Sequence, residues 1–187
     1  MKRLRLACVS ALALVPATGA TASEYKESLT LQGITFELSA TENAGASTLT
    51  IKPSGLKAMN DPVVQDVPGR VLRAEIADID SNGDPEIYVF TVDEKAKRGG
   101  VVGYAVNKKK SMSPIFVPDF TEDPKLSAGY AGGDESAVVE TFLVTRFKIY
   151  EGSGASAKPT DKWRQLQYKL KPGEAGWKLV LSKITEY

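Results

Sequence analysis

Apolar and polar residues alternate with a period of two through most of this chain, and this alternation constrains the fold more than any other feature. Every second residue is apolar in segment 164–170 (RQLQYKL) and in segment 177–181 (WKLVL), and Leu72, Ala74 and Ile76 repeat the pattern. A period of two is typical of β-strands with one buried face, and no segment shows the period of an amphipathic helix. The face predicted for the longest strand comprises Thr141, Leu143, Thr145, Phe147 and Ile149.

Short turn motifs separate the alternating segments. Glycine supplies positive φ angles and proline presets a turn, so these motifs mark the ends of strands. The strand candidates between them include SLTLQGITFEL, STLTIKP, EIYVFTV, GGVVGYAV and SPIFVP. The sequence therefore predicts an all-β fold, namely an antiparallel β-sandwich or flattened barrel of about eight strands. The turn motifs are Asn43-Ala-Gly45, Pro53-Ser-Gly55, Pro68-Gly69, Asn82-Gly83 and Pro172-Gly173.

The first residues have the composition of a secretory signal peptide. Segment 2–5 carries three basic side chains, segment 6–15 is apolar, and segment 20–22 (ATA) offers small residues before a cleavage site. This order of a basic, an apolar and a small-residue region is typical of exported proteins. We therefore predict a signal peptide at 1–22, a single β-sandwich domain at 23–187, and a periplasmic location.

Composition excludes several kinds of active site. The chain has no histidine, and its one cysteine, Cys8, lies in the predicted signal peptide. A serine–histidine–acid triad, a histidine or thiolate metal site and a disulfide are therefore impossible in the exported domain. Loss of the signal peptide leaves 21 Lys plus Arg against 23 Asp plus Glu, a net charge of −2. This charge argues against nucleic-acid binding, and no later stretch reaches the ~18 apolar residues of a membrane span.

Segment 78–90 (DIDSNGDPEIYVF) has oxygen-bearing side chains at alternate positions, and two interpretations stay open. In the first, Asn82-Gly83 is the turn of a β-hairpin between segments 73–79 and 86–92. In the second, the segment is a cation loop similar to those of FG-GAP repeats. An EF-hand is excluded because Val89 stands at the twelfth position, where a glutamate is needed. The ligands of a bound calcium ion would be Asp78, Asp80, Asn82, Asp84 and Glu86.

Several segments together resemble the periplasmic inhibitors of invertebrate-type (i-type) lysozyme. The resemblance covers about residues 28–181 and implies a β-rich protein that binds a host lysozyme and blocks peptidoglycan cleavage, which evades host defence. The implied mechanism is a protruding loop that enters the glycosidase cleft. The segments that carry the resemblance are LTLQGITFEL, AEIADIDSNGDPEIYV, GYAGGDESAVVETFLVTRFKIY, AKPT followed by RQLQYKL, and GEAGW.

The loop that aligns with the inhibitory loop of this family lies within segment 92–100. The family carries a Ser-Gly-x-Tyr element there, and none of its defining residues is present in this chain. The predicted lysozyme-binding residues are Lys95, Ala96, Lys97, Arg98 and Gly99. A glycosidase cleft holds two carboxyl groups, so a basic loop could complement it, with Arg98 binding a carboxylate bidentately. The alternative is a solvated hairpin tip that is charged for solubility.

A second contact is predicted in the long connection after segment 141–150. The predicted residues are Tyr150, Glu151 and Ser153, with Tyr150 interpreted either as a contact or as an aromatic residue over the core. Trp163 and Trp177 are expected to pack in the core or across strands.

Carboxylates are plentiful, but we expect them in turns where water keeps their pKa values near normal, and we predict that the protein is not an enzyme. The expected partner is a lysozyme of the invertebrate type. A homodimer stays open, as does a non-inhibitory envelope-binding module of the same fold with calcium in its acidic loop. The carboxylates that could serve in hydrolysis are Asp78, Asp80, Asp84, Glu86, Asp134, Glu135 and Glu140.

Overall fold

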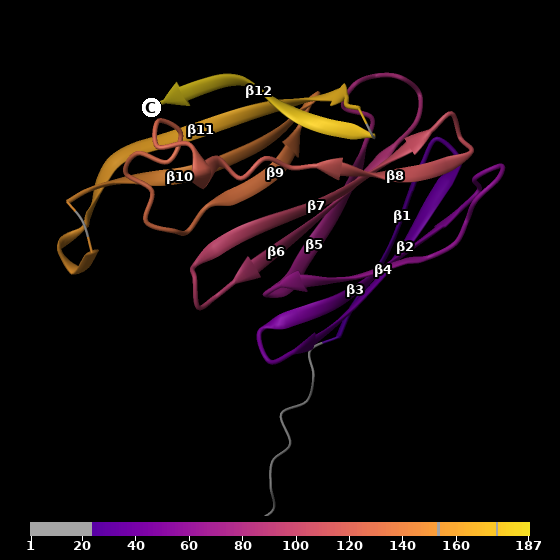
Figure 1. Cartoon of the computed structure of the whole chain (residues 1–187), viewed down its shortest axis with the longest axis horizontal. Coiled ribbons are helices and arrows are strands. Elements are labelled where there is room, and N and C mark those ends of the chain that lie inside the picture. The colour runs from indigo at the N-terminus through magenta and orange to yellow at the C-terminus, as the bar shows by residue number, and fades with distance from the viewer. Residues whose placement is uncertain (1–23, 153, 175) are drawn as a thin grey trace, which may run out of the picture.

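A computed structural model describes residues 24–152, 154–174 and 176–187, and these residues form an all-β protein (Figure 1). The predicted fold class is confirmed. The predicted signal peptide at 1–22 lies outside the described residues. The elements are β1 (Glu24–Leu31), β2 (Ile34–Asn43), β3 (Ala46–Ser54), β4 (Val63–Pro68), β5 (Arg70–Ala77), β6 (Glu86–Asp93), β7 (Arg98–Asn107), β8 (Ser111–Phe116), η1 (Phe120–Glu122), β9 (Glu135–Val139), β10 (Phe142–Glu151), η2 (Gly154–Ser156), β11 (Lys158–Pro172) and β12 (Trp177–Glu186).

The strands form two sheets. Strands β1 to β4 make a four-stranded meander, and the other strands make an eight-stranded sheet in the order β5-β6-β7-β8-β12-β11-β10-β9. Among the described strands, neighbours are antiparallel except β8 and β12, which are parallel over two residue pairs only. No helix in the described ranges is long and apolar enough to cross a membrane.

The eight-stranded sheet curls until its two edge strands, β5 and β9, approach each other. Arg73 on β5 donates a hydrogen bond from Nη2 to the Ser136 carbonyl at 2.6 Å. The Val138 amide donates to Glu75 Oε2 at 2.7 Å. Side chains of β5 thus occupy the gap and satisfy backbone groups of β9, so that the sheet is nearly a closed barrel.

Two hydrophobic cores lie on opposite faces of β6. Ile87 and Val89 pack into the core between the four-stranded sheet and β5–β7, while Tyr88 and Phe90 pack into the core inside the curled sheet. Alternate residues of a strand point to opposite faces, so a strand between two cores is buried on both sides. The largest fully buried side chains of the first core include Phe36, Ile34, Leu49 and Ile51, and those of the second include Phe147, Leu143 and Leu166.

Local backbone features explain where the strands differ from the sequence-based expectation. Segment 28–38 was expected to be one strand, but a turn at Gln32 and Gly33, both with positive φ, divides it into β1 and β2. Leu72 was expected beside Ala74 on one face, yet Leu72 is 44% exposed because the pairing with β6 shifts between Val71 and Arg73. This split, together with β4 and β9, which were not among the strand candidates, raises the strand count from about eight to the twelve present in the described residues.

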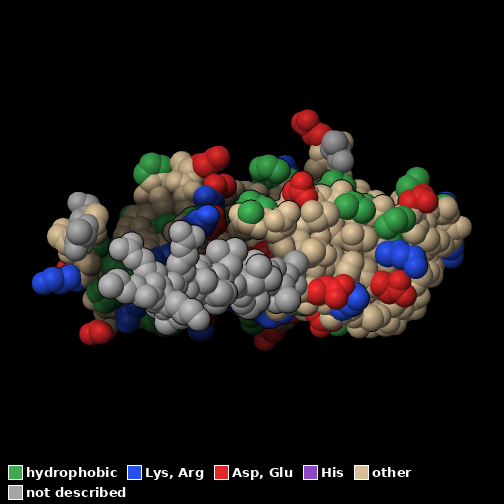
Figure 2. Space-filling view, turned by 90° about the horizontal axis from the view of Figure 1, so that it is seen from below, with side chains coloured by type: hydrophobic (Ala, Val, Ile, Leu, Met, Phe, Trp, Pro, Cys, Tyr) green, Lys and Arg blue, Asp and Glu red, His purple; other side chains and the backbone are tan. Residues whose placement is uncertain are grey.

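The space-filling view in Figure 2 shows acidic and basic side chains interspersed on the visible face of the described residues. This mixture agrees with the near balance of 24 basic and 23 acidic residues in the whole chain. No broad field of a single sign covers that part of the described surface.

Candidate functional site

The β6–β7 loop presents the predicted lysozyme-binding residues at the end of a hairpin. Glu94, Lys95, Ala96 and Lys97 are exposed to solvent. Asp93 closes the turn, because its Oδ1 accepts hydrogen bonds from the amides of Lys95 at 2.9 Å and Ala96 at 3.0 Å. This is the side-chain-to-backbone turn for which aspartate is favoured. The loop therefore has a defined conformation of its own.

The connection between η1 and β9 anchors the base of this loop. The Gly133 amide donates to the Lys97 carbonyl at 2.6 Å, and the Gly99 amide donates to Asp134 Oδ1 at 3.1 Å. A Cβ atom on Gly99 would lie 2.7 Å from the other oxygen of Asp134, so a larger residue there would require the Asp134 side chain to move. Lys97 is held at a φ of 52°, in the left-handed region that a lysine seldom adopts.

Arg98 has an intramolecular partner. Its Nη2 lies 2.5 Å from Asp119 Oδ1, and both side chains are partly buried. The hydrogen bond from Arg98 lowers the pKa of Asp119 to about 2. The same bond raises the pKa of Arg98. The structure thus separates the predicted cations of the loop: Lys95 and Lys97 face solvent, whereas Arg98 braces the loop base.

The second predicted loop lies toward the same end of the molecule as the β6–β7 loop (Figure 1). The Tyr150 amide donates to the Gly129 carbonyl at 2.8 Å, so the same η1–β9 connection contacts both loops. Tyr150 is partly buried at the end of β10, Glu151 is exposed, and Ser153 lies outside the described residues. The backbone of Tyr150 is thus tied to the η1–β9 connection, and Glu151 is the more exposed of these two residues.

The β5–β6 connection brings three of the five predicted cation ligands together. One carboxylate oxygen from each of Asp78, Asp80 and Glu86 lies within 4.8 Å of the other two. The side-chain oxygens of the other two residues accept hydrogen bonds. Asn82 donates its side-chain N–H to Asp80 Oδ2 at 2.9 Å, and its Oδ1 accepts from the Asp84 amide at 2.7 Å. Asp84 Oδ2 accepts the amide of Lys108 in the β7–β8 turn.

The hairpin between β5 and β6 is present, but Asn82-Gly83 is not a tight two-residue turn. The strands end at Ala77 and begin at Glu86, and the connection between them folds around Asp78. The carboxylate of Asp78 accepts hydrogen bonds from the amides of Asn82 and Gly83, each at 2.9 Å. The hairpin interpretation and the cation-loop geometry are therefore compatible.

Glu86 departs from the expectation that the carboxylates lie in water. Its side chain is fully buried, and burial, with smaller contributions from Asp80 and Asp78, raises its pKa to about 8. Glu86 Oε2 accepts the amide of Ile79 at 2.8 Å, whereas Oε1 has no hydrogen-bond partner within the described ranges. The expectation of near-normal pKa values was wrong here, because Glu86 opens a strand that lies between two cores.

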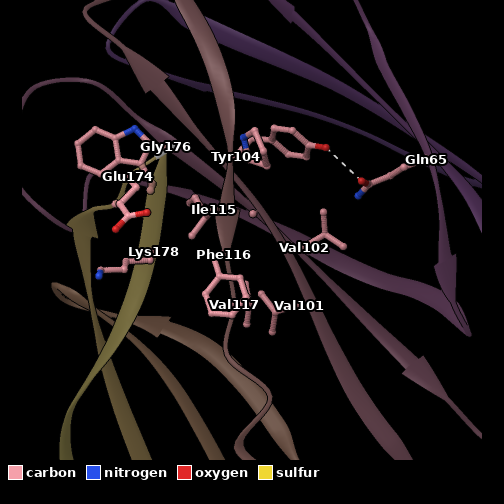
Figure 3. A pocket seen from close by; sticks show the side chains of 14 residues that line it. Gln65, Val101, Val102, Tyr104, Ile115, Phe116, Val117, Glu174, Gly176 and Lys178 are labelled. Carbon is pink, nitrogen blue, oxygen red and sulfur yellow. Dashed lines mark hydrogen bonds between the residues drawn. The ribbon is translucent and has the colours of Figure 1, made fainter.

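A shallow groove of about 570 Å³ crosses the junction of β7, β8 and β12 (Figure 3). Phe116, 67% exposed, and Val101 lie together on one side of it, and Glu174 and Lys178 lie on the other. Trp177 also lines the groove and donates its indole N–H to Asn107 at 2.9 Å. Trp177 packs against the core inside the curled sheet, as predicted. Trp163 lies under the guanidinium group of Arg146.

Comparisons with protein-family models, with curated proteins and with solved structures find no match for this chain. Its function must therefore be inferred from the geometry of the β6–β7 loop, the β5–β6 connection and the groove, together with the sequence resemblance.

Proposed function

We propose that the protein is an exported inhibitor of an i-type lysozyme, and that it blocks the glycosidase cleft with the β6–β7 loop. The observation that supports this proposal most is the rigid support of an exposed basic loop. Asp93 fixes the turn from inside, and Gly133, Asp134 and Asp119 hold its base from outside.

Rigid support matters because a loop that is already ordered loses little conformational entropy when it binds. Ordering costs about 0.5–1.5 kcal/mol for each mobile side chain at an interface. A loop such as 93–99, held at four points, avoids much of that cost in its backbone. Protein inhibitors that enter a cleft commonly bind with little backbone movement.

The charge of the loop suits an acidic cleft. In a retaining glycosidase two carboxyl groups lie about 5 Å apart. The exposed ammonium groups of Lys95 and Lys97 would approach them, whereas Arg98 stays paired with Asp119 and keeps the loop in shape. Because these lysines are exposed, salt screens their attraction, and the affinity should fall as ionic strength rises.

The test is inhibition of purified i-type lysozyme by the full chain without its predicted signal peptide. The double variant Lys95→Glu with Lys97→Glu should raise the inhibition constant at least tenfold at low salt. The matched control is Lys57→Glu with Lys183→Glu, which makes the same charge change at exposed positions outside the loop and should alter the constant less than twofold.

Two results would contradict the proposal. One is no inhibition of any i-type lysozyme by the wild type at a small molar excess. The other is an equal loss in both double variants, which would mean that net charge and not the loop determines binding. Chicken-type and goose-type lysozymes in the same assay define the target class.

A second candidate function is a non-inhibitory envelope-binding module, and the groove beside Phe116 favours it. The exposed aromatic ring on one side of the groove and the charged residues Glu174 and Lys178 on the other offer an apolar face with a polar rim, the combination found in small-ligand sites. A glycan strand is the envelope component whose surface combines apolar and polar faces in the same way as this groove. Co-sedimentation with purified peptidoglycan, lost in Phe116→Ser and retained in the Lys95/Lys97 double variant, would favour this function over inhibition.

A further inference from the structure

The carboxylate of Glu86 is the least satisfied charged group near the β5–β6 connection. It is fully buried, and within the described residues only one of its oxygens has a hydrogen-bond partner, the amide of Ile79. A buried polar atom without a partner is rare in folded proteins, because it has lost its water and gained nothing in return. Such an oxygen needs a proton or a cation.

The neighbours of Glu86 indicate a cation. One oxygen each of Asp78, Asp80 and Glu86 lies within 4.8 Å of the other two, so three carboxylates converge on one small volume. Carboxylates packed this closely repel one another when ionised. In the described part of the chain, the donors to the carboxylates of Asp78 and Asp80 are uncharged groups of Gln32, Asn82 and Gly83, which leave the repulsion in place.

We propose that Asp78, Asp80 and Glu86 bind a Ca²⁺ ion, with main-chain carbonyls and water completing its shell. Calcium takes six to eight oxygen ligands and accepts irregular geometry, which suits a loop followed by a buried glutamate. Soft metals such as zinc favour thiolate or imidazole, and the described chain has neither cysteine nor histidine. The site is independent of the proposed inhibition, because it lies at the opposite end of β6 from the β6–β7 loop.

The ion would stabilise the point where three turns meet. Asp78 Oδ2 accepts the side-chain amide of Gln32, which lies in the β1–β2 turn of the four-stranded sheet. Asp84 Oδ2 accepts the amide of Lys108 in the β7–β8 turn of the eight-stranded sheet. An ion bound by Asp78 would therefore fix a loop of the eight-stranded sheet that is hydrogen-bonded to the β1–β2 turn of the four-stranded sheet, and its effect should appear in the stability of the whole domain.

The experiment measures the melting temperature of the full chain in EDTA and in rising CaCl₂. A ligand that binds only the native state stabilises it by mass action, and at a hundredfold excess over Kd the expected rise is about 5–10 °C. MgCl₂ at equal concentration should give a much smaller rise, because Mg²⁺ requires near-octahedral geometry. No rise with CaCl₂, or an equal rise with both salts, would overturn the assignment.

Two variants in the same loop distinguish a specific calcium site from a loop that attracts cations by its net charge alone. Asp80→Asn removes a proposed ligand and should weaken Ca²⁺ binding, measured by calorimetric titration, at least tenfold. Asp84→Asn makes the same charge change, but its side chain faces Lys108 and should weaken binding less than threefold. Equal losses would show that net charge alone attracts the cation, and the proposal would fail.

Glu86→Gln gives a check that does not depend on affinity. In EDTA this variant should melt at or above the wild-type temperature, because a neutral amide replaces a buried carboxyl group whose ionised form is disfavoured, while its amide oxygen can still accept from Ile79. In CaCl₂ the wild type should gain its full rise, whereas the variant should gain almost none. A calcium response retained in full by Glu86→Gln would refute the role of this residue.

Discussion

Replacement of Arg164 by methionine should destabilise the protein far more than the same replacement of an exposed arginine. Arg164 lies on β11 and is only 9% exposed. Its Nη1 donates to three carbonyls of the η1–β9 connection, those of Lys125, Leu126 and Ala128, at 2.9–3.2 Å. Its Nε and Nη2 both donate to Glu186 Oε1 on β12, at 3.0 and 2.6 Å. One side chain thus joins two strands to an otherwise irregular segment.

The magnitude follows from the groups that lose their partner. A carbonyl left without a donor costs about 1–3 kcal/mol when it is buried, and the lower value applies here because Lys125 and Ala128 are exposed and water can enter. Three carbonyls at the lower value give about 3 kcal/mol. The pair with Glu186 adds less than about 1 kcal/mol, since Glu186 is 47% exposed. Methionine retains the apolar stem, so we expect a loss of about 3–4 kcal/mol in the free energy of unfolding.

Arg146→Met is the matched control for Arg164→Met. Arg146 also pairs with a glutamate, Glu135, at 2.7 Å, and it lies over the ring of Trp163 as Arg164 lies over that of Phe147, but both charged side chains of the Arg146 pair are about half exposed. An exposed pair of this kind contributes about 0–1 kcal/mol. Urea unfolding of both variants gives the two losses directly. A loss below about 1 kcal/mol for Arg164→Met, or equal losses in both, would refute the reasoning.

Two further predictions concern the backbone and acid stability. Gly69→Ala should lower the free energy of unfolding, measured in urea, by about 1–3 kcal/mol more than Gly33→Ala. Both glycines have a positive φ, but only at Gly69 would the new Cβ atom meet backbone, because it would lie 1.9 Å from the Val92 carbonyl oxygen. Equal losses in the two variants would contradict this reasoning. The pKa of Asp119 lies near 2 and below its ordinary 3.8, so its pairing with Arg98 stabilises the fold above about pH 4 and is lost toward pH 2. The stability difference between wild type and Asp119→Asn should therefore shrink over that interval, and a constant difference would refute the pairing.

Strand faces were predictable where a strand has a single buried face. Leu143, Phe147 and Leu166 are fully buried, as the period of two predicted. Thr141 and Leu72 are exceptions, because Thr141 is exposed and lies before β10, and Leu72 shows the limit of the method. A register shift next to Leu72 turns the side chain outward, and such a shift depends on the pairing with β6, which local alternation does not contain.

The candidate loop was predictable in position but not in environment. The cluster of basic residues at 95–98 marks a hairpin tip, yet nothing near it indicates that Arg98 pairs with Asp119, 21 residues later, or that Gly99 donates to Asp134, 35 residues later. Asp119 is the N-cap residue of η1 and Asp134 lies in the η1–β9 connection, and neither segment has the alternation of a strand. Contacts between segments so far apart are set by tertiary packing, and a single sequence holds no local signal for them.

The burial of Glu86 could have been inferred from the sequence, because it follows from the strand that contains it. Glu86, Tyr88 and Phe90 are separated by two residues each and lie on one face of β6, while Ile87 and Val89 lie on the other. A run that is apolar on both faces indicates a strand covered on both sides, and a carboxylate at its first position must then be buried with it. The same strand ends about 23 Å away at Asp93, which fixes the exposed loop. The proposed cation site and the proposed binding loop therefore lie at opposite ends of one buried strand, and this separation is why a change at one end should leave the geometry of the other unchanged.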